Sequence, residues 1–221
     1  MRRNTTQRGL SLVELMVAMA VGLVIMAGLL TLFLNHHTGY TLTAAMGRAQ
    51  EAGDFGLSLM ARYIRMAGFD PDQPASTAVD TTLSINGAVS DTLAISFIPV
   101  DNQHCAGTAS DAVTNIFFVQ NNELRCQDGG GNTEILATGI ENLQVQYGVD
   151  LNSDGQIDRY QTAPDENDLS IRLGLLANAG PNAALAARNR SYNVLDATIA
   201  HNADSTLRRI FTTTIYLANT R

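Results

Sequence analysis

The longest apolar run of the chain lies near its N-terminus, between Leu10 and Leu34. The run covers about 25 residues, which is enough for a helix to cross the ~30 Å hydrocarbon core of a bilayer. It contains a single charged side chain, that of Glu14. Arginines precede the run and no basic cluster follows it closely, so the positive-inside rule places the N-terminus in the cytoplasm. We therefore predict one membrane-spanning helix over residues 10–34, with the remainder of the chain outside the cytoplasm.

Helical spacing continues after the membrane segment. Apolar residues recur mainly every three or four positions, and they are Leu42, Ala45, Ala49, Ala52, Leu59, Tyr63 and Met66. We predict one long helix from Leu10 to about Met66, broken or kinked near Gly39, whose amphipathic half (residues 35–68) packs on the body. Gly68 and Pro71 are expected to end this helix.

Beyond residue 69 the pattern changes to the two-residue alternation of β-strands. Strands are expected at Thr92–Ile98, Asn115–Val119, Glu123–Cys126, Glu141–Val149, Leu169–Leu176 and Ile210–Leu217. The Asn121-Asn122 pair predicts a hairpin. Asp70–Ser90 and Ala179–Asn193 are expected to be loops, the second with a helical turn. A long helix covering one face of an antiparallel sheet is an α+β fold, with residues 69–221 as one β-rich globular domain outside the cytoplasm.

Composition and charge exclude several classes of function. The formal net charge is -7 over 221 residues, and the 14 basic residues are all arginines. An acidic body without a stripe of basic and aromatic residues is not expected to bind nucleic acid by itself. The sequence contains no nucleophile elbow, phosphate-binding loop or His-Glu-x-x-His motif, so no enzymatic activity is expected.

The chain contains two cysteines, Cys105 and Cys126. In an oxidising compartment they could form one bridge, which would close a loop of about 20 residues and stabilise the fold by roughly 3 kcal/mol in the chain-entropy picture. Two free buried thiols are the alternative, and no Cys-x-x-Cys redox motif is present. His36 and His37 are expected at the membrane interface, and His104 beside Cys105 is too little for a zinc site.

Glu14 distinguishes between classes of membrane segment. A secretory signal would have a shorter apolar run and a small-x-small cleavage site. A plain single-pass anchor explains the length and the arginines but not the carboxylate, which costs up to ~3 kcal/mol in the membrane on insertion scales. Glu14 either reaches the interface or is protonated, or it pairs with a positively charged partner.

The stretch from Arg8 to Leu15 (RGLSLVEL) resembles the class III signal of type IV pilins and pseudopilins. The resemblance implies that a prepilin peptidase cuts after Gly9, leaving residues 1–9 as a cytoplasmic leader, and then methylates the amine of Leu10. It also implies that Glu14 neutralises the N-terminal amine of a neighbouring subunit during assembly. A buried carboxylate and a buried amine are each costly alone and tolerable as a pair. Leu10 departs from the phenylalanine that is usual in the family.

Several stretches of the body resemble the PilW-type minor pilins and, more distantly, the J-type minor pseudopilin of type II secretion. They are Phe55–Gly68, Cys105 with Leu124–Cys126, Ile140–Asp150, the acidic loop that follows, and Arg208–Thr214. The resemblance implies the type IV pilin fold and a low-copy structural subunit that primes assembly of a type IV pilus and sits at or near its tip. Its location would be the bacterial inner membrane and then the pilus at the cell surface.

The implied partners are other minor and major pilins, the prepilin peptidase and the inner-membrane assembly platform. Two alternatives stay open. One is a J-like minor pseudopilin of type II secretion. The other is a tip-exposed subunit that binds an adhesion partner through the loops Asp70–Ser90 and Asp150–Asp168.

An acidic stretch follows the strand that ends at Val149. It matches the first nine positions of a calcium loop, with oxygens from the side chains of Asp150, Asn152, Asp154 and Asp158 and the carbonyl of Gln156. The twelfth position holds Gln161 in place of a glutamate, so Asp165, Glu166, Asp168 or water would have to substitute. A plain polar turn is the alternative, because Asp, Asn, Ser and Gly favour turns. We treat the stretch as a candidate calcium loop that would stiffen the body.

Overall fold

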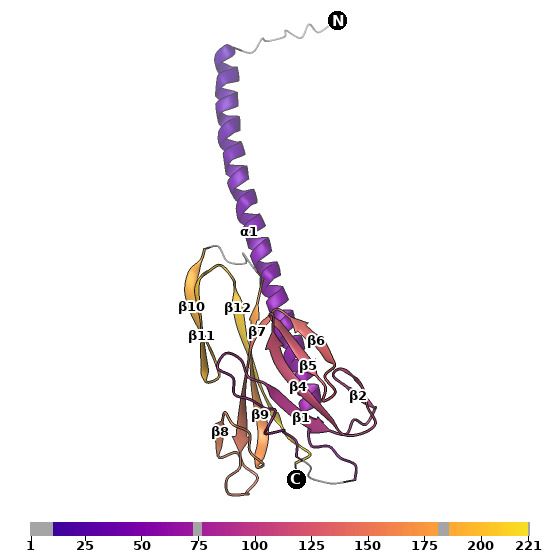
Figure 1. The fold of residues 1–221 in the computed structure, drawn as a ribbon. Helices are drawn as coiled ribbons and strands as arrows, with labels where there is room; N and C mark the ends of the chain where they lie inside the picture. The colour runs from indigo at the N-terminus through magenta and orange to yellow at the C-terminus, as the bar shows by residue number, and fades with distance from the viewer. Residues whose placement is uncertain (1–10, 73–76, 181–185, 221) are drawn as a thin grey trace, which may run out of the picture. The chain divides into compact units, whose positions relative to one another are not determined.

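The structure is a computed structural model that describes residues 11–72, 77–180 and 186–220. These residues form one long helix and twelve strands (Figure 1). The chain divides into two compact units, residues 1–43 and 44–221. Each unit is described by itself.

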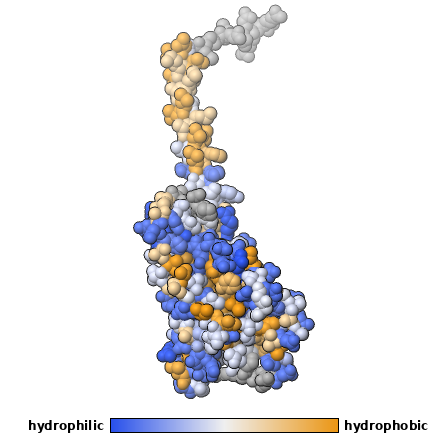
Figure 2. All heavy atoms as spheres, viewed as in Figure 1, coloured by the Kyte–Doolittle hydropathy of each residue, from blue (hydrophilic) through white to orange (hydrophobic). Residues whose placement is uncertain are grey.

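The described part of the first unit consists of the beginning of α1 (Leu12–Ile64). Every large apolar side chain between Leu12 and Leu34 is exposed, and Figure 2 shows these side chains in orange along the helix. By length and composition α1 could cross a membrane. The helix runs without interruption from Leu12 to Ile64, so the expected break near Gly39 is wrong. A glycine within a helix costs only about 1 kcal/mol, which good helix formers on both sides can outweigh.

The C-terminal end of α1 is capped by a nearby glycine and by an asparagine that is distant in sequence. Gly68 adopts a positive φ of 76°, the left-handed conformation common after a last helical turn. The side chain of Asn219 donates hydrogen bonds to the carbonyls of Arg65 (3.1 Å) and Ala67 (3.2 Å). These bonds satisfy carbonyls that a helix end leaves without partners.

The second unit contains two antiparallel sheets of four strands each. The first sheet has the order β1 (Leu93–Phe97), β4 (Val113–Gln120), β5 (Glu123–Gln127) and β6 (Thr133–Thr138). The second has the order β12 (Arg208–Tyr216), β9 (Asp168–Asn178), β7 (Ile140–Val149) and β8 (Arg159–Gln161).

Two smaller hairpins complete the second unit. They are β2 (Gln103–His104) with β3 (Gly107–Thr108), and β10 (Arg188–Val194) with β11 (Ala197–Asp204). Figure 1 shows β10 and β11 as a hairpin separate from the two larger sheets. The loop predicted over Ala179–Asn193 is therefore wrong from Arg188 onward, because a strand begins there; residues 181–185 lie outside the described part.

The six predicted strands correspond to β1, β4, β5, β7, β9 and β12. The predicted hairpin is confirmed, because Gln120 pairs with Glu123 and both Asn121 and Asn122 have positive φ (55° and 60°). Two consecutive residues in this conformation form the turn whose twist suits a hairpin. The α+β class is likewise confirmed.

The second half of α1 approaches the sheets closely at two glycines. A Cβ added to Gly53 would overlap the ring of Phe211 on β12. A Cβ added to Gly56 would lie 3.2 Å from Leu124 Cδ2 and 3.3 Å from Leu175 Cδ1. Burial of apolar area along this contact is the main stabilising term of the unit. The core contains Met60, Ile64, Leu93, Ile95, Phe117, Leu143, Ile171 and Leu173, among others.

Candidate functional site

The first turn of α1 carries the one carboxylate of the membrane-length segment. Ser11 Oγ accepts a hydrogen bond from the backbone N–H of Glu14 at 3.1 Å, and the Ser11 carbonyl accepts one from Leu15 at 3.2 Å. This is N-cap geometry, and it places Glu14 in the first turn, where negative charge favours the positive end of the helix dipole.

Within the described part of the chain, Glu14 has no ion-pair partner. Its carboxylate therefore remains available to a cation from another molecule. The predicted cleavage and methylation residues, Gly9 and Leu10, lie outside the described residues.

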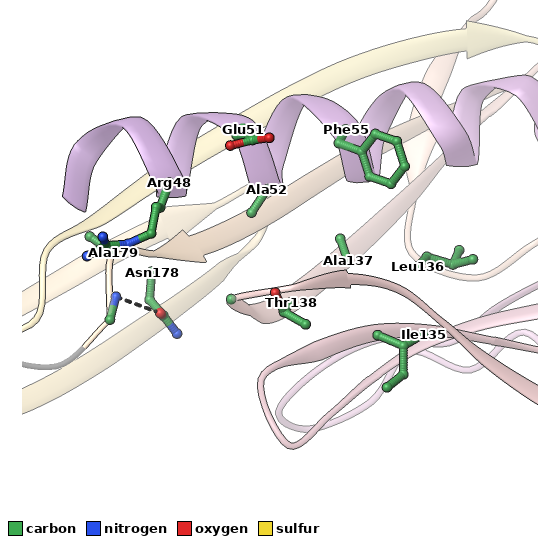
Figure 3. Close-up of a pocket in the computed structure, with 12 residues that line it drawn as sticks. Arg48, Glu51, Ala52, Phe55, Ile135, Leu136, Ala137, Thr138, Asn178 and Ala179 are labelled. Carbon is green, nitrogen blue, oxygen red and sulfur yellow. Dashed lines mark hydrogen bonds between the residues drawn. The ribbon is translucent and has the colours of Figure 1, made fainter. Parts of the chain in front are cut away.

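A groove of about 700 Å³ lies between α1 and the end of β6. Figure 3 shows Ala52 and Phe55 of the helix facing Ala137 and Ile135, with Arg48 and Glu51 at the rim. The groove is lined mainly by aliphatic side chains and backbone, and its residues include no nucleophile paired with a base.

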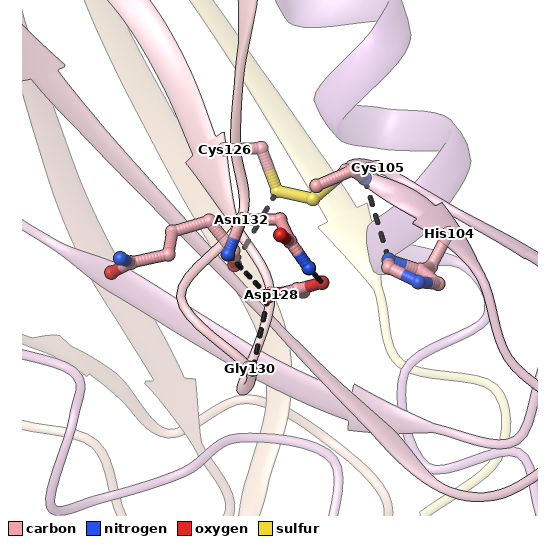
Figure 4. Close-up of a disulfide and its surroundings, with 8 residues drawn as sticks. His104, Cys105, Cys126, Asp128, Gly130 and Asn132 are labelled. Atoms are coloured by element: carbon pink, nitrogen blue, oxygen red, sulfur yellow. Dashed lines mark hydrogen bonds between the residues drawn. A yellow bond between two sulfur atoms is a disulfide. The ribbon is translucent and has the colours of Figure 1, made fainter.

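Cys105 and Cys126 form a disulfide, with their Cα atoms 6.0 Å apart (Figure 4). The expected bridge is therefore present, and it joins the β2–β3 hairpin to β5. Both residues are buried, Cys126 completely. The turn after β5 is closed separately by Asp128, whose Oδ1 accepts the N–H groups of Gly130 (2.9 Å) and Asn132 (2.8 Å). The bridge and the turn fix this side of the first sheet.

The acidic loop after β7 folds on its own backbone. The carboxylate of Asp150 accepts N–H groups from Asn152 (3.2 Å), Asp154 (3.3 Å) and Gly155 (2.8 Å). Asp158 Oδ2 accepts the N–H of Leu151 at 2.7 Å. Among residues 11–72, 77–180 and 186–220, no three His, Cys, Asp or Glu side chains are grouped so that they could hold a metal ion. The structure does not support the predicted calcium loop and shows the polar turn instead.

Two carboxyl groups of the second unit, those of Asp91 and Asp168, are buried, and they differ in their hydrogen bonding. Asp91 accepts N–H groups from Val145 (2.7 Å) and Gly87 (3.0 Å), yet burial still raises its pKa. Burial raises the pKa of Asp168 to about 7, the charge of Asp165 adds to this, and one N–H bond from Asp165 opposes it. Asp168 Oδ1 is buried without a hydrogen-bond partner among the described residues.

A cluster of charges joins the β10–β11 hairpin to the second sheet. Arg208 donates to Glu141 through Nε and to Asp204 through Nη1 (3.0 Å), and its side chain is 5% exposed. His201 lies 3.5 Å from Glu141 Oε2 and 3.6 Å from Asp204 Oδ2. Burial acts to lower the pKa of Arg208, but its bonds to the two carboxylates outweigh burial and raise it. The hydrogen bond from Arg208 holds the pKa of Asp204 below its usual value.

Comparison with models of protein families shows the family to which the chain belongs. The model of type IV pilus-assembly protein W, or PilW, matches residues 107–219, which is just over half of the chain. The chain belongs to the PilW family. The model of the prokaryotic N-terminal methylation motif matches residues 4–30, which include Gly9, Leu10 and Glu14. The chain is thus a type IV minor pilin of the PilW type, and this family and fold are those of structural subunits.

One solved structure shows the same type of fold. The type IV-like pilin TTHA1219 from Thermus thermophilus matches with a TM-score of 0.54 and 14% identity, covering 78% of this chain and 97% of that one. The GspK-GspI-GspJ complex from the enterotoxigenic Escherichia coli type 2 secretion system matches at 9% identity, covering 74% of this chain and 96% of that one. Its TM-score of 0.38 is too low to support an argument. The comparison with curated proteins gave no match.

Proposed function

We propose that this chain is a minor pilin that primes assembly of a type IV pilus and remains at or near its tip. A prepilin peptidase removes residues 1–9 and methylates Leu10. Residues 10–34 then anchor the subunit in the inner membrane with the body in the periplasm. Residues 35–68 contain the rest of the helix, which ends at Ile64, and the turn that follows it. Residues 69–221 form the periplasmic domain.

The observation that carries the proposal is the isolated carboxylate of Glu14. Glu14 lies in a helix whose large apolar side chains are exposed from Leu12 to Leu34, and no cation of the described chain reaches it. A lone carboxylate in hydrocarbon costs several kcal/mol, and a positively charged partner removes much of that cost. The N-terminal amine of a neighbouring pilin supplies such a charge at the matching depth of the membrane.

The apolar half of α1 also specifies the partners. Other minor and major pilins have the same kind of helix, so their helices can cover this one as the filament forms. Before assembly the helix resides in the inner membrane, where the peptidase and the assembly platform act. The acidic body carries no basic stripe, so nucleic-acid binding by this chain alone is not part of the proposal.

The test replaces the wild-type gene with Glu14→Val or Glu14→Gln as the only copy. The expected result is normal membrane insertion and cleavage after Gly9, with at least a tenfold loss of surface pili. Mass spectrometry of the subunit from sheared filaments should find wild-type chains that begin at methylated Leu10. Ser11→Ala is the matched control, because it weakens the helix cap but leaves the carboxylate in place.

Several results would contradict or change the proposal. Normal piliation with Glu14→Val would remove the role given to the carboxylate. An uncut subunit confined to the inner membrane would show a plain anchor. Loss of protein secretion with unchanged piliation would assign the chain to a type II secretion pseudopilus, and normal filaments that fail to adhere after loop trimming would assign a tip-binding role.

A further inference from the structure

The groove between α1 and β6, which we call the β6 groove, lies beside a free edge of the first sheet. β6 pairs with β5 on one side and is the last strand of this sheet. At the opposite end of the sheet, the N–H groups of Gly68 and Asp80 donate to carbonyls of β1. Among residues 11–72, 77–180 and 186–220, no backbone hydrogen bond reaches the outer edge of β6. The outer N–H and C=O groups of β6 are therefore open to a further strand.

The lining of the β6 groove shows that the groove follows this edge. Every residue from Ile135 to Gly139 lines it in succession. Successive side chains of a strand point to opposite faces of the sheet. A hollow that touches all of these residues therefore lies along the edge and not over one face. A strand of this length extends over about 17 Å, which suits a short extended peptide segment.

The groove exposes apolar surface. Phe55 of α1 is 54% exposed and Ile135 of β6 is 49% exposed, although both side chains are large and apolar. Ala52 and Ala137 point towards one another across the groove (Figure 3), and their small side chains leave space between the helix and the strand. An occupant of this space would cover Phe55 and Ile135 and so remove apolar area from water.

Two charged residues at the rim, Arg48 and Glu51, have no ion-pair partner among the described residues. Figure 3 shows Arg48 beside Asn178 and Ala179, at the end of the groove away from Phe55. An acidic side chain of an occupant would meet the guanidinium at that end, and hydrogen bonds between guanidinium and carboxylate groups are strong and directional. The groove thus combines an apolar stretch with a site for one negative charge.

We propose that the β6 groove binds an extended segment of another protein chain, which adds to β6 as a further strand. The open backbone groups of β6 favour a strand as the occupant, because a helix satisfies its own backbone groups and has few to offer. Every second side chain of an added strand faces the same side, so the segment is apolar at alternate positions. It carries an acidic residue at the end that meets Arg48. The proposal does not depend on the function proposed above, because it concerns only the second unit.

The experiment uses the full chain in detergent and a fluorescently labelled peptide of seven residues, in which valine alternates with threonine. Aspartate occupies the first position in one version and the last position in another, because a strand can add in either direction. At least one version should bind saturably below about 1 mM, as measured by fluorescence anisotropy. Hydrogen exchange of the β6 amides should slow when this peptide is bound.

Methylation of the peptide backbone tests for strand addition. A strand added to one edge uses the N–H groups of alternate residues only. Methylating the valine nitrogens and methylating the threonine nitrogens should therefore have unequal effects. One methylated peptide should bind about as well as the parent peptide, and the other should bind at least tenfold more weakly. Equal effects of the two modifications would contradict strand addition.

Variants of the chain locate the bound peptide. Phe55→Ser should weaken binding at least fivefold, because it removes an apolar wall of the groove. Tyr216→Ser is the matched control, since Tyr216 is an aromatic residue with 51% exposure that does not line the groove. This control should bind like the wild type. Arg48→Gln should weaken binding of the aspartate peptide severalfold and leave binding of the same peptide with asparagine unchanged.

Three further outcomes would overturn the proposal. The first is no saturable binding of either peptide by the wild type up to about 1 mM. The second is equal affinity of the wild type and Phe55→Ser, which would place the peptide elsewhere. The third is a wild-type dimer that Phe55→Ser abolishes, without peptide binding, because a second copy would then cover the groove. If Phe55→Ser does not fold, the two methylated peptides decide, because they require only the wild-type chain.

Discussion

Gly53 is a residue at which α1 packs tightly against β12 of the second sheet. Alanine is favoured over glycine by about 1 kcal/mol within a helix, but a Cβ at this position would overlap the ring of Phe211. We expect Gly53→Ala to lower the free energy of unfolding by roughly 1–3 kcal/mol, since overpacking forces the helix or the ring to move. Thermal or urea unfolding of the full chain in detergent measures this.

Gly47 provides the control for Gly53. It lies in the same helix, and a Cβ added there meets no atom within 4 Å. Gly47→Ala should therefore raise stability slightly, through helix propensity alone. Equal changes in the two variants would show that the contact with Phe211 is not tight.

Asp168 makes stability depend on pH. Its pKa rises from 3.8 to about 7 in the folded chain because the carboxyl group is buried. Between these values the folded state binds the proton more tightly than the unfolded state does, so this contribution to stability is present at low pH and is lost as pH rises towards 7.

The matching variant is Asp168→Asn. It should unfold at nearly the same denaturant concentration as the wild type at pH 4. At pH 8 it should be more stable by up to about 4 kcal/mol, from about 1.4 kcal/mol per pKa unit. If the difference in free energy of unfolding between the wild type and the variant is the same at pH 4 and pH 8, the pKa of Asp168 is not raised by folding.

At the scale of elements, the β10–β11 hairpin depends on Arg208. The hairpin shares no ladder with the second sheet, and Arg208 connects Asp204 at its end to Glu141 on β7. Removing one partner of a buried ion pair costs about 3–5 kcal/mol, because the remaining charges lose their compensation. We expect Arg208→Met to destabilise the chain by about that amount and to speed hydrogen exchange in β10 and β11 first.

Arg209 is the matched control for this experiment. It is the next residue of β12, but its side chain is exposed and makes no ion pair with the described residues. Its guanidinium carbon lies 5.7 Å from the centre of the Phe211 ring. Arg209→Met should change stability by less than about 1 kcal/mol. Similar exchange in both variants would mean that the hairpin is held by apolar packing.

The strands that the sequence predicts are those with an apolar face. Leu143, Val145 and Tyr147 of β7 alternate because that face lies in the core. β10 and β11 could not be predicted in this way, because they are mostly polar and only Val194 is fully buried among their residues. β8 is a strand of three residues, too short for periodicity to register.

The candidate sites also differ in how far the sequence could predict them. The position of Glu14 within the membrane-length helix could be predicted, since a charge within an apolar run is a local signal. Its role in assembly stays a prediction. The bridge between Cys105 and Cys126 could be predicted, because the chain has two cysteines and the predicted compartment is oxidising. The calcium pattern misled, because Asp, Asn and Ser side chains bind backbone N–H groups in a turn just as they bind a cation. The burial of Asp168 could not be predicted from the sequence, because it depends on the pairing of β7 with β9.

At the scale of the molecule, the two units differ in the solvent they require. The first unit exposes its apolar side chains, whereas the second has its own core. We predict that a chain shortened to residues 44–221 folds without detergent and unfolds cooperatively, as a compact domain does. Circular dichroism during thermal melting tests this, and an aggregated or non-cooperative product would show that the first unit is needed for folding.

The burial of the disulfide has a consequence for the order of biogenesis. Cys126 is inaccessible in the finished sheet and Cys105 is nearly so, and buried thiols are poor substrates for exchange. An oxidant must therefore reach both sulfurs before β5 is covered, while the second unit is still folding. Once this unit has closed, the same burial protects the bond from reductants. The covalent cross-link is thus made during folding and is kept afterwards by the packing of the first sheet.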